Sequence, residues 1–101
     1  MYGLSPEDIK KIKSVFMPVP QVESVVIFGS RAIGTYHPGS DIDLCLKGDI
    51  DLSIQSRIEN ALDSLNLIYQ FDIVLYNRLT SQNILEHIDK KGALFYSKEQ
   101  N

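Results

Sequence analysis

Two aspartates alternate with apolar residues in the segment Asp41-Ile42-Asp43-Leu44-Cys45-Leu46. Successive side chains of a strand point to opposite faces, so Asp41 and Asp43 would share one face while the apolar residues between them face a core. Two neighbouring carboxylates suit Mg²⁺, which prefers oxygen ligands and completes its shell with water and substrate phosphates. Taken alone, the pair is equally typical of a strand with a solvated outer face.

A second candidate feature, Gly29-Ser30, lies upstream, where the apolar run of residues 25–28 stops. Gly29 allows the backbone to approach a ligand closely, and amides at the start of a short helix from Ser30 can donate to a phosphate. The Ser30 hydroxyl can add a donor, although it can also simply cap the helix. Arg31 is a further candidate for phosphate contact, with a surface salt bridge as the alternative.

Asp72 is the only charged residue in the apolar and aromatic stretch of residues 69–76. A third carboxylate on a neighbouring strand would complete a site for two Mg²⁺ ions, in which one activates an attacking oxygen and the other steadies the leaving phosphate. A carboxylate buried there without a cation would carry a large desolvation penalty, which favours a metal ligand. The alternative is a hydrogen-bonded structural aspartate.

The elements that would position these residues alternate between helix and strand. Helices are predicted from Pro6 to residue 16 with Ser5 as cap, from a cap at Asp51 or Ser53 to about residue 65, and from a cap at Thr80 or Ser81 to residue 91. Strands are predicted at 24–28, 41–46 and 69–76, with a short edge strand at 93–96. The pattern predicts an α/β fold: a small mixed sheet with helices packed largely on one face.

Length and composition predict one domain, residues 1–101, with a single modest core. The formal net charge of −3 argues against general affinity for nucleic acid, because phosphate binding usually needs a surplus of Lys and Arg. The lone Cys45 is expected to be a packed thiol. Neither a bilayer-spanning apolar segment nor a signal-peptide pattern is present, so the expected location is the cytoplasm.

Gly29-Ser30, ten residues, Asp41-x-Asp43, and Asp72 on a later strand together resemble the signature of the DNA polymerase beta-like nucleotidyltransferase superfamily. The short chain looks most like the minimal nucleotidyltransferases within it. The resemblance implies that Asp41, Asp43 and Asp72 hold Mg²⁺, with Asp72 also acting as base, and that Gly29 and Ser30 cradle a nucleoside triphosphate. The family often has a second basic residue where this chain has Ile33, which leaves Arg31 to carry the phosphate contact.

Many minimal members act as the antitoxin of a helical HEPN-domain toxin. The resemblance therefore implies transfer of AMP from ATP to a tyrosine hydroxyl of such a partner, and a complex with it. Two alternatives stay open: a catalytically weak antitoxin that only occludes its partner, and a small-molecule nucleotidyltransferase. The last is disfavoured because such enzymes normally carry an extra acceptor-binding domain. His37 is expected to be a solvated loop residue, and His87 is expected to lie near the surface of the last helix.

Overall fold

The computed structural model describes residues 1–100 as a four-stranded mixed sheet with four α-helices. The sheet order is β3-β2-β1-β4. The central pair β1 and β2 is antiparallel, β4 adds to β1 antiparallel, and β3 adds to β2 in parallel. The strands are β1 Val22–Phe28, β2 Ile42–Gly48, β3 Phe71–Leu75 and β4 Ala93–Ser97. The predicted fold class is confirmed, with the strand at 24–28 in the predicted central position.

The helices are α1 Pro6–Phe16, α2 Ser30–Ile33, α3 Leu52–Asp63 and α4 Gln82–Lys91, with 3₁₀ turns at Tyr76–Arg78 and Lys98–Gln100. Ser5, Asp51 and Ser81 cap α1, α3 and α4, each through its side-chain oxygen. Such a cap satisfies one of the amide donors left free at a helix start. Of the two caps predicted for each of the later helices, Asp51 is the cap of α3 and Ser81 is the cap of α4. Among the described residues, no helix is long and apolar enough to cross a membrane.

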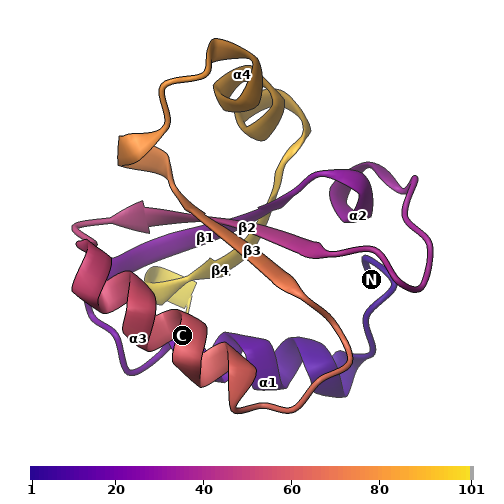
Figure 1. The fold of residues 1–101 in the computed structure, drawn as a ribbon, viewed down its shortest axis with the longest axis horizontal. Coiled ribbons are helices and arrows are strands. Elements are labelled where there is room, and N and C mark those ends of the chain that lie inside the picture. The colour runs from indigo at the N-terminus through magenta and orange to yellow at the C-terminus, as the bar shows by residue number, and fades with distance from the viewer. Residues whose placement is uncertain (101) are drawn as a thin grey trace.

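The two faces of the sheet are covered unequally. Figure 1 shows α1 and α3 side by side along one face and α4 crossing the other. The main core lies under α1 and α3, where Ile12 and Phe16 of α1 and Ile58 and Leu62 of α3 are buried. It takes in Ile42, Leu44 and Leu46 of β2, the residues that alternation predicts to face inward. Beneath α4, a much smaller cluster consists of Val26, Cys45 and Ile88. The face carrying Asp43 is therefore only partly covered.

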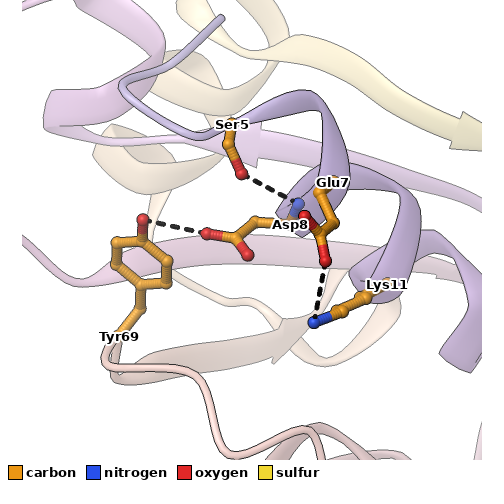
Figure 2. Close-up of polar contacts among 5 residues, drawn as sticks. All are labelled: Ser5, Glu7, Asp8, Lys11 and Tyr69. Carbon is orange, nitrogen blue, oxygen red and sulfur yellow. Dashed lines mark hydrogen bonds and ion pairs between the residues drawn. The ribbon is translucent and has the colours of Figure 1, made fainter.

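The third strand is shorter than predicted, because the tyrosines at the two ends of the predicted segment lie outside the sheet. Tyr76 begins a 3₁₀ turn. Tyr69 precedes the strand, and its hydroxyl donates to Asp8 Oδ2 at 3.1 Å. Figure 2 shows this contact beside the α1 cap, where Ser5 Oγ accepts from the Asp8 amide at 3.0 Å. Tyr69 thereby ties the loop before β3 to the start of α1.

Candidate active site

Strand register brings the carboxylates of Asp43 and Asp72 to one place. Asp43 of β2 lies opposite Asp72 of the parallel neighbour β3 and opposite Phe28 of the antiparallel neighbour β1. Residues directly opposite each other share a face of the sheet, so the two aspartates project from the face on the α4 side. Asp41 immediately precedes β2, two residues before Asp43, and its charge acts on Asp43. The shared face of Asp41 and Asp43 stays a prediction, because Asp41 lies just outside the strand.

The three carboxylates differ in their exposure. Asp41 and Asp72 are exposed, whereas Asp43 is half-buried in the central strand. Burial raises the pKa of Asp43, and the charges of Asp72 and Asp41 raise it further. The charged form of Asp43 is thus disfavoured by burial and by its acidic neighbours, and a bound cation would favour it.

The desolvation argument made for Asp72 from its apolar surroundings is wrong. Asp72 is exposed because β3 is an edge strand of the sheet, so one side of its backbone has no neighbouring strand. Of the apolar residues around it, Ile73 and Leu75 face the main core on the other side of the sheet, while Val74 shares the face of Asp72 and packs against the cluster under α4. The desolvation argument applies instead to Asp43.

Gly29 lies directly against Asp43, the central member of the acidic row formed by Asp41, Asp43 and Asp72. It follows Phe28 at the end of β1 and has φ 74° and ψ −156°, a region that is open essentially only to glycine. A Cβ at this position would overlap with Oδ2 of Asp43. The group that lies against Gly29 is therefore the carboxylate of Asp43, and the close approach of a ligand stays a prediction. Ser30 follows as the first residue of the four-residue α2.

Arg31 does not join the other candidate residues. Its side chain is 2% exposed, and its guanidinium donates to the backbone carbonyls of Tyr2, Pro38 and Ser40. It also stacks on the rings of Tyr36 and Tyr69, at 5.3 and 5.1 Å from their centroids. These contacts engage the donors that the predicted phosphate contact would need. Arg31 instead fixes the peptide that leads into Asp41, and we do not include it in the candidate site.

His87 lies against the candidate site, although the sequence predicted only a position near the surface of the last helix. Its Nε2 accepts the Gly29 amide at 2.9 Å, and its ring meets Phe28 edge-on with centroids 6.1 Å apart. The one local indication in the sequence is that His87 precedes Ile88, the buried residue of α4. Its hydrogen-bond partner Gly29 lies 58 residues away in the chain, where no periodicity links the two. His37, in contrast, is exposed as predicted.

The oxygen donors fit a hard divalent cation. Among residues 1–100, no three His, Cys, Asp or Glu side chains lie close enough to hold a metal ion between them. Mg²⁺ does not require three, because it is usually bound by one or two carboxylates, waters and substrate phosphates. Asp43 with Asp41 or Asp72 would supply that protein share, because all three side chains offer carboxylate oxygens.

Comparisons with known proteins concern the family and the fold of the chain. A family model described as polymerase beta, nucleotidyltransferase, matches residues 10–101. No curated protein matches the chain. Among solved structures, a crystal structure of a toxin-antitoxin with AMP-PNP aligns with a TM-score of 0.73 at 23% identity, covering 92% of this chain and 76% of that one.

Two further solved structures share the fold. One is a chain from a complex of tri-AMPylated Shewanella oneidensis HEPN toxin with MNT antitoxin, with a TM-score of 0.59 and 19% identity over 93% of this chain and 70% of that one. The other is described as a nucleotidyltransferase from Sulfolobus solfataricus, with a TM-score of 0.60 and 20% identity over 93% of this chain and 80% of that one. At these identities the likeness concerns the fold.

Proposed function

Because this chain belongs to the polymerase beta nucleotidyltransferase family, we propose that it is a Mg²⁺-dependent adenylyltransferase, which moves AMP from ATP to a tyrosine hydroxyl of a HEPN-domain toxin and so acts as its antitoxin. The observation that carries the proposal is the row formed by Asp43 and Asp72 in register, with Asp41 beside it and Gly29 against it. Similar folds occur in complexes of an AMPylated HEPN toxin and of a toxin-antitoxin with AMP-PNP, which supports the choice of partner and nucleotide.

The proposed roles follow from exposure and position. Asp41 and Asp43, with Asp72 across the strands, would hold two Mg²⁺ ions, which supply charge stabilisation to the triphosphate and to the attacking oxygen. Gly29 and Ser30 would face the triphosphate, because Gly29 leaves the Asp43 carboxylate uncovered. The exposed Asp72 is open to a large acceptor, and it can draw the proton from the incoming hydroxyl as a general base. In-line attack on the α-phosphorus then releases pyrophosphate.

The test uses ATP labelled at the α-phosphate, with γ-labelled ATP in parallel, Mg²⁺, this protein and the HEPN-domain partner. Label should move to the partner from the α-position only. The double variant Asp41→Asn/Asp43→Asn should lose roughly 100-fold or more of the rate, because each 1.36 kcal/mol of lost charge stabilisation is a factor of ten. Asp49→Asn is the matched control, since Asp49 is exposed just beyond the other end of β2.

The alternative of occlusion gives a different result. If the wild type and the double variant bind the partner equally tightly and neither transfers label, the protein neutralises its partner by complex formation alone. Transfer to a small hydroxyl compound, with none to the protein partner, would instead identify a small-molecule nucleotidyltransferase. Either result overturns the proposed acceptor.

A further inference from the structure

His87 connects α4 to the turn that ends β1. The next residue, Ile88, is buried against Val26 and Cys45 of the sheet, which fixes the helix on this face. His87 itself is half-buried. Its ring packs edge-on against Phe28 at an interplanar angle of 74°, and Nε2 accepts the amide of the following residue, Gly29, at 2.9 Å. An imidazole that accepts at Nε2 carries its ring proton on Nδ1.

The Gly29 amide is a backbone donor in an unusual position. The strand β1 ends at Phe28, so the Gly29 N–H donates to an imidazole from another element instead of a neighbouring strand. Gly29 also has a backbone conformation that only glycine adopts readily, and it has no side chain of its own with which to anchor the turn. His87 is a contact from outside the turn that holds it.

The position of Gly29 bears on Asp43 through direct steric contact. Oδ2 of Asp43 occupies the space that a side chain at position 29 would fill. A movement of the Gly29 backbone by a fraction of an ångström toward β2 would therefore displace the carboxylate, and a movement away would leave it unsupported. The contact from His87 to Gly29 to Asp43 thus joins α4 to the central aspartate of the acidic row.

We propose that His87 is a positioning residue of the active site: by accepting the Gly29 amide it fixes the β1–α2 turn, and through that turn it holds the Asp43 carboxylate in place for cation binding. The catalytic consequence rests on the proposed function. The placement of the turn does not, because it can be observed without any nucleotide.

Two substitutions separate the hydrogen bond from the packing of the ring. His87→Gln keeps an acceptor oxygen near the place of Nε2, whereas His87→Phe keeps an aromatic ring beside Phe28 and removes the acceptor. His37→Gln is the control, because His37 is an exposed histidine in the loop before Asp41. Circular dichroism and thermal unfolding establish that each variant folds, and His87→Leu replaces the Phe variant if that one does not.

Three readouts follow: the Gly29 amide resonance and the His87 Nε2 shift in ¹H–¹⁵N NMR, the affinity for Mn²⁺ as a probe for Mg²⁺, and the rate of α-label transfer. We expect Nε2 to have the shift of an unprotonated nitrogen. His87→Phe should move the Gly29 resonance and lower Mn²⁺ affinity and transfer roughly 10- to 100-fold, the usual effect of losing a residue that supports a metal ligand. His87→Gln should keep most of the wild-type Mn²⁺ affinity and of the wild-type transfer rate.

The proposal fails if His87→Phe leaves the Gly29 resonance and the Mn²⁺ affinity at wild-type values. It also fails if this variant binds ATP more tightly than the wild type, since His87 would then compete with the nucleotide for the amide. A wild-type protein that binds Mn²⁺ but transfers no label would refute the proposed function, while the NMR and affinity results would still decide the role of His87.

Discussion

Replacing Arg31 with methionine is expected to destabilise the fold by about 3 kcal/mol. Its guanidinium donates to the carbonyl of Tyr2 at 2.8 Å, of Ser40 at 2.9 and 3.1 Å, and of Pro38 at 3.3 Å. A hydrogen bond to a charged group contributes about 1.5–3 kcal/mol. Pro38 is exposed, and its carbonyl can turn to water, so we count only the acceptors in the half-buried Tyr2 and Ser40, at the lower end of the range.

Urea and thermal unfolding followed by circular dichroism measure this change. In a protein of this size each kcal/mol lowers Tm by about 4–8 °C, so Arg31→Met should lower it by roughly 12–24 °C. Arg31→Lys should lose about half as much, because one ammonium cannot reproduce the forked donors that serve several carbonyls. Arg57→Met, on the exposed face of α3, is the control and should stay within about 0.5 kcal/mol of the wild type.

The opposite pattern would refute the structural role of Arg31. If Arg31→Met unfolds at the wild-type urea concentration while its affinity for MgATP falls severalfold, then the guanidinium serves the triphosphate, as its position in the sequence motif predicted. A joint loss of stability and affinity would leave the structural role in place, because a displaced Ser40 also displaces Asp41.

Three further predictions concern Gly29, Asp43 and Cys45. Gly29→Ala should destabilise the fold by about 1–3 kcal/mol through backbone strain and should abolish transfer by pushing Asp43 aside, as measured by urea unfolding and the label assay. Burial and the charges of Asp72 and Asp41 raise the pKa of Asp43 above 3.8 in the folded protein. Without metal, the wild type should therefore lose stability as the pH rises from 3.8 through this raised pKa. Asp43→Asn should remove that loss, giving in EDTA a higher Tm than the wild type at pH 7 and no gain at pH 3; an equal Tm at pH 7 would contradict this. Burial raises the pKa of Cys45 to about 11, so a disulfide reagent at pH 8 should react with it only after unfolding; labelling of the native protein would contradict this.

The predictable parts of the site are those that follow from local alternation. The alternating pattern of the segment at 41–46 places Asp43 opposite the core, and the apolar neighbours of Asp72 place it on the same face once β3 pairs with β2. The helix caps at Ser5, Asp51 and Ser81 are equally local, because a side chain bonds an amide three residues ahead.

The parts that could not be predicted depend on contacts between distant segments. Asp72 is exposed because β3 is an edge strand, and the sequence of β3 alone does not show its position in the sheet. The sequence predicts phosphate contact for Arg31, with a surface salt bridge as the alternative, because the carbonyl of Tyr2 and the ring of Tyr69 that bury it come from distant segments. His87 gains its role only when α4 crosses the sheet and reaches Gly29.

The parallel register of β2 and β3 also constrains how the protein can change in evolution. A shift of β3 by one residue would turn Asp72 into the core under α3 and expose Ile73 and Leu75, so the hydrophobic effect penalises any register that removes the carboxylate from the site. Selection for a stable core therefore preserves the active-site spacing without acting on activity. Insertions in the loop at residues 64–70 leave this coupling intact, whereas a single inserted residue inside β3 disrupts stability and function together.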